Sequence, residues 1–409
     1  MNVSDSSALR ACTSCGFCGA VCPTGAIEIK LNREGFYRPE VDAAKCVDCG
    51  LCVKSCYRFA ADLARGATDG CELYGARAKN DDVVRTTTSG GIADVMARRL
   101  VAEGYTCIGV GFNPETNRAE GCVASDVEST AQFRGSKYIQ SYSVDAFREL
   151  VKMHRNKKFA VFGLPCHIYA VNQFLKSRGE RDRHVLIDLY CHGCPSLLTW
   201  HKYTGELLQR VEGKRVLGAT FRSKVRGWGN FYVVVVVVVE GREEPLTIVS
   251  PRINDSFYQL FFSDTVLNDS CPDCKLRSTF AYTDIRLGDF WGPVYSSNHT
   301  GMSAVTVCSE TGRRLFASIA GEITSARHEF RKFLPWQSFG KTYRVNEELR
   351  ERMLEQLADP NVPLKATTKL YVRTLPMKKR ILRVAKNIVS LMPQGIMSNI
   401  KKTVQKLRK

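Results

Sequence analysis

The sequence has few of the features that mark a membrane or secreted protein. It contains no run of about 18 apolar residues, the length that a transmembrane helix needs. The longest apolar run, from Phe231 to Val239, fits a strand that is buried on both faces. No apolar segment typical of a secretory signal follows Met1. We therefore expect a cytoplasmic protein without a transmembrane segment.

Acidic residues are missing from one part of the chain, residues 361–409. This tail carries thirteen Lys or Arg and no Asp or Glu. The net charge of the whole chain is +18 at pH 7, so the tail supplies most of it. The rest of the chain is only weakly basic.

Apolar residues recur at helical spacing in this tail, with Lys and Arg between them. The apolar positions are Met377, Ile381, Val384, Ile388 and Leu391 in one segment, and Met397, Ile400, Val404 and Leu407 in a second. Basic amphipathic helices bind membrane surfaces, where each Lys or Arg near an anionic leaflet contributes roughly 1 kcal/mol. We expect peripheral contact with the inner face of the membrane; packing onto the core and docking to a partner protein are the alternatives. Aromatic side chains that would stack on bases are nearly absent, which argues against nucleic acid.

Cysteine, in contrast, is abundant: the chain has 17, and eight of them form two runs near the N-terminus. The runs are Cys12, Cys15, Cys18 and Cys22, followed by Cys46, Cys49, Cys52 and Cys56. This repeated spacing is the signature of a bacterial-type ferredoxin with two 4Fe–4S clusters. Zinc sites use pairs of cysteines, and disulfide frameworks belong to small secreted chains. The sequence therefore predicts iron–sulfur clusters and single-electron chemistry.

Each cluster is expected to take three cysteines from one run and its fourth from the other, because the fourth lies too far along the chain. One cluster would use Cys12, Cys15, Cys18 and Cys56, and the other would use Cys46, Cys49, Cys52 and Cys22. Tyr57 follows Cys56 where the pattern has proline, which loosens the second turn but removes no ligand.

The chain divides into three predicted units, and the fold class is α+β. Residues 1–65 form the ferredoxin-like module, residues 71–345 form a mixed α/β core that binds flavin and iron–sulfur, and residues 361–409 form the basic helical tail. Residues 65–70 are predicted to link the module to the core. The expected elements of the core are helices over 92–103 and 144–154, and strands over 107–112, 159–162, 185–189 and 231–240. A short strand over 26–29 is expected in the module.

A hydroxyl-rich turn from Thr86 to Gly91 precedes the first of these core helices. Backbone amides at the start of a helix make a ready site for an anion, such as the pyrophosphate of a flavin. An ordinary helix N-cap is the alternative explanation.

Four further cysteines lie in polar loops. Cys166 and Cys191 follow strand-like segments, where the active sites of α/β proteins gather. Cys271 and Cys274 share a later loop. A buried structural cysteine usually lies within an apolar run, so these four residues are interpreted as functional.

Taken in order, the motifs of the core resemble the family of coenzyme F-420 hydrogenase/dehydrogenase beta subunits. They are T-S-G-G-I at 88–92, G-S-K-Y at 135–138, G-x-P-C at 163–166, C-H-G-x-P-S-x-x-x-W at 191–200, F-R-x-K-x-x-G-W at 221–228, C-x-x-C-K at 271–275 and D-I-x-L-G-D-F-W-G at 284–292. No single motif is specific, but the ordered set is, and the resemblance spans about residues 12–310. It implies an FAD, one further 4Fe–4S cluster in the core, and hydride exchange with a soluble donor.

The resemblance also assigns roles to residues. It implies that FAD is held by Thr88, Ser89, Gly90 and Gly91, and that the flavin or substrate pocket is lined by Ser136, Lys137 and Tyr138. A lysine near the electron-rich edge of a flavin stabilises its anionic reduced form; a surface lysine is the alternative. The third cluster is assigned to Cys166, Cys191, Cys271 and Cys274.

Two histidines and five other cysteines complete the set of candidates. His167 and His192 flank the core cysteines and are candidate catalytic proton donors, with a hydrogen bond to a thiolate or carbonyl as the alternative role. Cys194 stands where the family has an apolar residue, and it allows a rival zinc site on two C-x2-C pairs, Cys191 with Cys194 and Cys271 with Cys274. The cysteines that belong to no motif are interpreted as buried thiols: Cys71, Cys107, Cys122 and Cys308.

The sequence therefore predicts an iron–sulfur flavoprotein oxidoreductase. Electrons would pass singly through the clusters, and FAD would exchange them as a hydride with a soluble partner such as F-420, ferredoxin or a nicotinamide. A nicotinamide is disfavoured because no Gly-x-Gly-x-x-Gly fingerprint follows a strand-like segment. The alternative is a non-catalytic electron-transfer subunit that docks to a partner oxidoreductase. A reductase acting on a sugar, lipid or membrane quinone fits the tail, but no core motif selects it.

Overall fold

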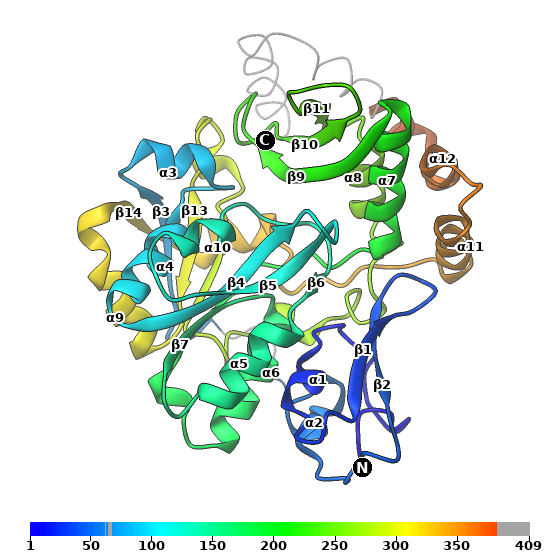
Figure 1. Cartoon of the computed structure of the whole chain (residues 1–409). Coiled ribbons are helices and arrows are strands. Elements are labelled where there is room, and N and C mark those ends of the chain that lie inside the picture. The colour runs from blue at the N-terminus through cyan, green and yellow to red at the C-terminus, as the bar shows by residue number, and fades with distance from the viewer. Residues whose placement is uncertain (62, 64–67, 383–409) are drawn as a thin grey trace.

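The computed structural model describes residues 1–61, 63 and 68–382 of the chain (Figure 1). A small N-terminal module packs on a larger core that is built around a nine-stranded sheet and a separate three-stranded sheet. Part of the predicted linker and residues 383–409 of the predicted tail lie outside the described residues.

The module contains one hairpin and two short helices. Its elements are α1 (Phe17–Val21), β1 (Ile27–Leu31), β2 (Tyr37–Val41), α2 (Leu51–Lys54) and the 3-10 helix η1 (Tyr57–Phe59). Each α-helix begins after a glycine in the left-handed conformation, Gly16 with φ 72° and Gly50 with φ 71°. Side chains other than glycine rarely adopt this conformation, and it turns the backbone sharply between the second and third cysteines of each run. Strand β1 confirms the strand expected over 26–29, shifted by one residue at its start.

The nine-stranded sheet of the core is mixed. In spatial order its strands are β14 (Ile323–His328), β3 (Glu72–Ala78), β13 (Ser303–Val307), β12 (Ile285–Asp289), β8 (Val185–Leu189), β7 (Lys158–Phe162), β4 (Tyr105–Asn113), β5 (Arg118–Ala124) and β6 (Ser141–Tyr142). The strands β12, β8, β7 and β4 run parallel to one another, and the β5–β6 pair is also parallel; the other neighbours are antiparallel. The parallel centre makes the core a mixed α/β structure, as expected.

Helices cover both faces of this sheet. One face carries α5 (Val144–Met153) and α6 (Pro165–Ser177), and the other carries α3 (Asp81–Thr86), α4 (Ile92–Ala102) and α9 (Glu310–Ser318). Strand β7 shows how the sequence supplies both faces, because alternate residues of a strand point to opposite sides. Phe159 and Val161 belong to the first apolar cluster, whereas Ala160 belongs to the second. A strand buried on both sides is apolar throughout, so its sequence shows no alternation.

The second sheet contains the valine run. Its strands are β9 (Gly213–Ser223), β10 (Tyr232–Val239) and β11 (Leu246–Pro251), with α7 (Leu197–Arg210) and α8 (Ser256–Phe261) beside it. Strand β10 is central and antiparallel to both neighbours. Val233, Val235 and Val237 are fully buried, whereas the valines between them are only half-buried. The expectation of burial on both faces was therefore wrong, because this antiparallel sheet packs one face on the core and leaves the other partly open.

The C-terminal part of the described chain packs on α7. Its helices are α10 (Phe330–Phe333), α11 (Glu347–Ala358) and α12 (Leu364–Thr374). The ammonium group of Lys202, on α7, donates to the carbonyl oxygens of Gln356, Asp359 and Val362 at 2.6 Å each. Thus the first part of the predicted tail lies against the core, while a following helical turn exposes Met377. Most apolar positions of the two predicted tail helices lie outside the described residues.

The remaining 3-10 helices are short. They are η2 (Ser129–Phe133), η3 (Arg181–Arg183), η4 (Lys275–Ser278), η5 (Pro293–Tyr295), η6 (Ala320–Glu322) and η7 (Leu334–Trp336). Within residues 1–61, 63 and 68–382, no helix combines the length and the apolar character that a bilayer crossing needs. The elements expected over 92–103, 144–154, 107–112, 159–162, 185–189 and 231–240 are all confirmed, with ends that differ by two residues at most.

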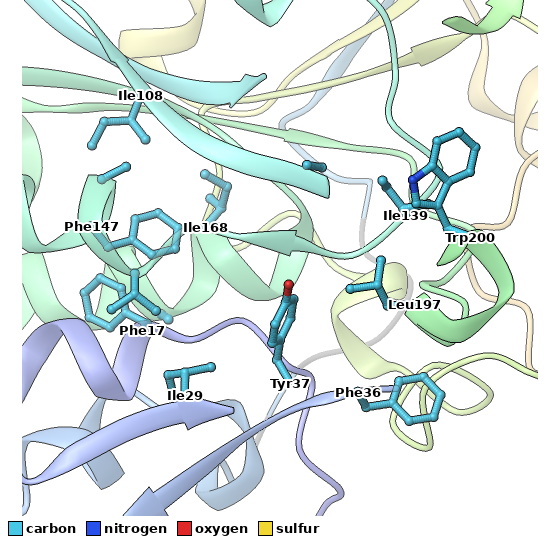
Figure 2. Close-up of a cluster of buried hydrophobic side chains, with 14 of the residues drawn as sticks. Phe17, Ile29, Phe36, Tyr37, Ile108, Ile139, Phe147, Ile168, Leu197 and Trp200 are labelled. Atoms are coloured by element: carbon cyan, nitrogen blue, oxygen red, sulfur yellow. The ribbon is translucent and has the colours of Figure 1, made fainter. Parts of the chain in front are cut away.

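The module and the core share one apolar cluster. Figure 2 shows Phe17 of the module close to Phe147 and Ile168 of the core. The ring of Phe17 meets those of Phe147 and Phe174 with centroid distances of 5.5 and 5.8 Å. Each such buried aromatic contributes roughly 1.5–3 kcal/mol. Backbone contacts join the two parts as well, since the side-chain amide of Gln140 donates to the carbonyl of Gly35 at 2.7 Å. The module therefore has a fixed position on the core.

Candidate functional site

Two cavities in the module are each bordered by four of its cysteines. The first, of about 440 Å³, has Cys12, Cys15, Cys18 and Cys56 in its lining, and Cys52 at its edge. The second, of about 310 Å³, has Cys22, Cys46, Cys49 and Cys52. These are the two sets that the exchange of the fourth cysteine predicts. Cys49 is the exposed member of the eight, so the second cavity lies nearer the surface.

The thiols of the first cavity converge in a buried place. Burial raises the pKa of the Cys18 thiol well above its usual range, and the nearby thiols of Cys15, Cys12 and Cys56 raise it further. Burial likewise raises the pKa of the Cys56 thiol to about 12. Buried thiols in such a group ionise only when a cation is bound among them. An all-thiolate set of soft ligands is what iron–sulfur clusters take, so donors and cavities fit a cluster in each place.

Five cysteines of the core converge in a second group. They are Cys166 in the first turn of α6, Cys191 and Cys194 in the loop after β8, and Cys271 and Cys274 in the loop before η4. Burial raises the pKa of the Cys166 thiol well above its usual range, with further contributions from Cys15, Cys194, Cys191 and Cys274. Burial also raises the pKa of Cys191 to about 12 and that of Cys271 to about 11. The four cysteines assigned to a third cluster are thus neighbours, and Cys194 joins them.

The two loops that carry most of these cysteines are held together by their backbones. Pro195 forms an isolated bridge with Leu267, and the Asn268 N–H donates to the carbonyl of Cys194 at 2.8 Å. The Cys194 N–H points to the sulfur of Cys271 at 3.4 Å. Gly193 permits this approach, because a Cβ there would lie 2.8 Å from Cδ1 of Leu267. The loop sequence C-H-G-C-P therefore brings its cysteines against the later C-x2-C loop.

The two groups of cysteines meet across the interface between module and core. Helix α6 begins beside Cys166, and its Ala170 lines the first cavity of the module. The backbone N–H of Lys275, next to Cys274, donates to the hydroxyl of Tyr57 at 2.8 Å. The first cavity therefore lies between the second cavity and the core cysteines.

A mononuclear metal site is not preformed in the described part of the chain. No three His, Cys, Asp or Glu side chains there are placed to hold a metal ion, and this includes the two C-x2-C pairs of the zinc alternative. A cluster differs, because its own iron and sulfide fill the space between four thiols.

The predicted flavin residues come together from two loops. The hydroxyl of Thr88 accepts the Ser136 N–H at 2.7 Å, which joins the turn before α4 to the G-S-K-Y segment. The Ser89 hydroxyl donates to the carbonyl of Met302, and the Gly90 N–H donates to the hydroxyl of Ser303. These bonds fix the turn against the end of β13. The first amides of α4 follow directly, where a helix has N–H groups without an intrahelical partner.

Lys137 holds its own loop in place. Its ammonium group donates to the carbonyl oxygens of Val110, Gln132 and Arg134 at 2.7, 3.2 and 3.0 Å. An ammonium has three protons, so all of them are used. Burial lowers the pKa of this group to about 8. In this arrangement Lys137 positions the segment that carries Ser136 and Tyr138; its contact with a flavin stays a prediction.

The site also contains residues that sequence analysis did not single out. The buried guanidinium of Arg222 donates to the Tyr138 hydroxyl at 2.9 Å and to the Asp289 carboxylate at 2.7 Å. Its Nε and Nη2 have no hydrogen-bond partner within the described residues. A buried donor without a partner is costly, so these atoms fit an anionic group of a bound molecule. The signal was present in the F-R-x-K-x-x-G-W motif, which places two cations at the end of a strand.

Three neighbours extend this part of the site. The ammonium group of Lys224 donates to the carbonyl of Ser89 at 2.6 Å, and the indole N–H of Trp228 donates to Asp289 at 2.7 Å. The rings of Trp228 and Trp291 stack with centroids 4.7 Å apart and an angle of 9°. The motifs at 88–92, 135–138, 221–228 and 284–292 therefore meet in one place.

The two candidate histidines have different surroundings. The Nε2 atom of His192 lies 2.7 Å from the Asp264 carboxylate, and its Nδ1 lies 3.1 Å from the Tyr343 hydroxyl. His167 is buried edge-on against Phe147, and burial lowers its pKa to about 4, so it is neutral at pH 7. A proton relay through His192 has partners on both nitrogens; the catalytic roles of both histidines stay predictions.

Comparison with known families matches two segments of the chain. Residues 11–60 match the 4Fe-4S dicluster domain. Residues 156–329 match the family described as the C terminus of the beta subunit of coenzyme F420 hydrogenase/dehydrogenase. The second segment contains the five core cysteines and Arg222.

Two curated relatives and one solved structure are similar. The F-type subunit of the F(420)H(2) dehydrogenase of Methanosarcina mazei is 25% identical over 188 residues, which are 44% of this chain and 53% of the relative. An uncharacterized protein of Methanocaldococcus jannaschii is 26% identical over 196 residues, 41% of this chain and 54% of the relative. The chain thus spans about half the length of the curated relatives it matches. A chain of the F420-reducing NiFe hydrogenase complex from Methanosarcina barkeri has a TM-score of 0.46 and 17% identity, covering 76% of this chain and 94% of that chain.

Proposed function

We propose that this chain, which carries a 4Fe-4S dicluster domain and the C-terminal domain found in beta subunits of coenzyme F-420 hydrogenases and dehydrogenases, is an iron–sulfur flavoprotein oxidoreductase. It would pass electrons between a soluble hydride or electron donor, such as reduced F-420 or ferredoxin, and a one-electron partner. The observation that carries the proposal is the meeting of three cysteine groups in a row, from the surface of the module to the core.

The cysteine groups would serve as an electron path. Cys49 marks the outer end of this path, since it is exposed, and Cys166 marks the inner end. The Cys15 thiol contributes to the raised pKa of Cys166 across the interface, so the two sets lie within electrostatic reach of each other. Clusters on Cys12, Cys15, Cys18 and Cys56, on Cys22, Cys46, Cys49 and Cys52, and on the core cysteines would each supply one-electron chemistry.

The residues around Arg222 would bind the flavin. An FAD supplies the exchange of one hydride for two single electrons when it is bound. Arg222 would satisfy its free donors on an anionic group of the ligand, and Tyr138 and Asp289 orient the guanidinium. The turn from Thr88 to Gly91 would present backbone amides. Trp228 and Trp291 would exclude water from one side.

A variant of Cys166 tests the path. The purified chain is mixed with reduced F-420 under anaerobic conditions, and reduction of the iron–sulfur absorbance is followed against time. We expect Cys166→Ser to keep the module's iron but to lose its reduction by the hydride donor at least tenfold. Cys122→Ser, outside all cysteine groups, is the matched control and should react like the unaltered chain. Equal rates in Cys166→Ser and the unaltered chain would contradict the path.

The alternative is an electron-transfer subunit without a substrate of its own. It is favoured by the relative from Methanosarcina mazei, which by its name is one subunit of a dehydrogenase. The discriminating measurement uses the purified chain with a hydride donor and a viologen acceptor. Turnover by the chain alone supports the enzyme, whereas turnover only after a partner oxidoreductase is added supports the subunit.

A further inference from the structure

Cys71 and Cys308 face each other across two neighbouring strands of the core. The register of β3 with β13 pairs Glu72 with Val307, and the next positions outward are the two cysteines. Their thiols are joined by a hydrogen bond. Both residues are partly exposed, and neither belongs to the motifs or cavities described above.

The backbone at this pair suits a disulfide. The Cys308 N–H donates to the carbonyl of Asp284 at 2.8 Å, on the β12 side, and so it points away from β3. An antiparallel pair whose backbone groups point away from each other is a non-hydrogen-bonded pair, in which the Cα atoms are about 4.5 Å apart. Disulfides span Cα separations of about 4.4–6.8 Å. A bond between the two sulfurs therefore needs no rearrangement of the strands.

The two thiols differ in reactivity. The hydrogen bond from Cys308 lowers the pKa of the Cys71 thiol, and the nearby guanidinium groups of Arg286 and Arg313 lower it further. Burial raises the pKa of the Cys308 thiol well above its usual range. The thiolate is the attacking species in exchange with disulfides, so Cys71 is the residue that reacts first.

We propose that Cys71 and Cys308 form a redox-active dithiol that exchanges with low-molecular-weight disulfides. The Cys71 thiolate attacks one sulfur of the small disulfide, whose S–S bond breaks and releases one thiolate. The Cys308 thiol then loses its proton to water and attacks the Cys71 sulfur, which releases the second thiolate. The two cysteines are oxidised to one disulfide, and the small disulfide is reduced to two thiols.

The position of the pair links it to the core site. Arg286 lies near both thiols and donates to the carbonyl oxygens of Leu276 and Arg277 at 3.2 and 3.3 Å. These residues lie just after Cys274 in the chain. The dithiol therefore lies beside the arginine that holds the loop of the core cysteines. Its disulfide closes a long loop of chain, and cross-links of that kind raise stability.

Peptide mapping tests the proposal. The full chain is incubated anaerobically with excess oxidised glutathione, quenched with acid, alkylated and digested with trypsin. Peptides 66–77 and 287–313 each contain one cysteine of the pair. We expect them to be recovered as one cross-linked species that dithiothreitol separates, and we expect a higher thermal midpoint for the oxidised chain.

Single substitutions test the order of the steps. Cys308→Ser should accumulate a glutathione adduct on Cys71, whereas Cys71→Ser should form an adduct on Cys308 at least tenfold more slowly. Cys107→Ser is the matched control, because Cys107 is buried on β4 away from the pair, and it should still form the cross-link. Recovery of both peptides singly alkylated, or of separate adducts in the unaltered chain, would overturn the dithiol. Equal adduct rates in the two variants would overturn Cys71 as the attacking residue.

Discussion

Replacing Arg286 by methionine should destabilise the core more than any change at a surface charge. Arg286 is fully buried, and its guanidinium donates to the Asp188 carboxylate at 2.8 Å and to the Tyr282 hydroxyl at 2.7 Å. It also donates to carbonyl oxygens of the segment that follows Cys274. Arg286→Met leaves a buried carboxylate without its partner, which costs about 3–5 kcal/mol.

The measurement is unfolding in urea, followed by the loss of tryptophan fluorescence under anaerobic conditions. With a slope of about 3 kcal/mol per molar, the loss corresponds to a midpoint lowered by roughly 1–1.5 M. Two variants serve as controls. Arg313→Met removes an exposed ion pair with Glu310 and should cost about 0–1 kcal/mol. Asp188→Leu combined with Arg286→Met removes both buried charges and should recover much of the loss.

The reasoning would be refuted by either of two results. If Arg286→Met and Arg313→Met shift the midpoint equally, the buried pair has no special importance. If the double variant is as unstable as Arg286→Met alone, the loss comes from packing and not from the unpaired Asp188.

Three other predictions concern the site and the stability of the fold. Gly90→Ala places a Cβ 2.4 Å from the carbonyl oxygen of Ala76, so the turn must shift; bound FAD per chain should fall while module iron is kept, and Gly205→Ala, with open space around its Cβ, should change neither. Burial lowers the pKa of His184 to about 4, so the unfolded chain takes up the proton first as the pH falls through about 6.5; between pH 7.5 and 5.5 this should remove about 1.3 kcal/mol of stability, and His184→Gln should abolish that part of the pH dependence in urea unfolding. Phe17→Ala empties the contact between module and core and should cost about 3–5 kcal/mol, measured as a lower thermal midpoint; an unchanged midpoint would show that the module does not depend on this contact.

The ferredoxin-like module could be predicted from sequence almost completely, because its ligands are close in the chain. Cysteines three residues apart leave few arrangements, and the turns at Gly16 and Gly50 follow from the same short segments. The strands and helices of the core were also predictable, since alternation at residues such as Phe159 and Ala160 follows from burial of both sheet faces.

The parts that sequence could not give depend on contacts between distant segments. Arg222 meets Tyr138 and Asp289 across 84 and 67 residues, so nothing local indicates that its guanidinium is buried. The carbonyl partners of Lys137 lie on β4 and η2, and its lysine pattern alone resembles a flavin contact equally well. The valine run was interpreted as buried on both faces, because a run of one residue type conceals which positions face solvent.

The most direct test of the central claim is the metal and flavin content of the anaerobically purified chain. Iron, sulfide, zinc and flavin are quantified per polypeptide in one preparation. The account predicts about twelve iron and twelve sulfide, corresponding to three 4Fe–4S clusters, together with one FAD. About eight iron with one zinc and no flavin would contradict it, and would leave a two-cluster ferredoxin joined to a zinc-stabilised domain.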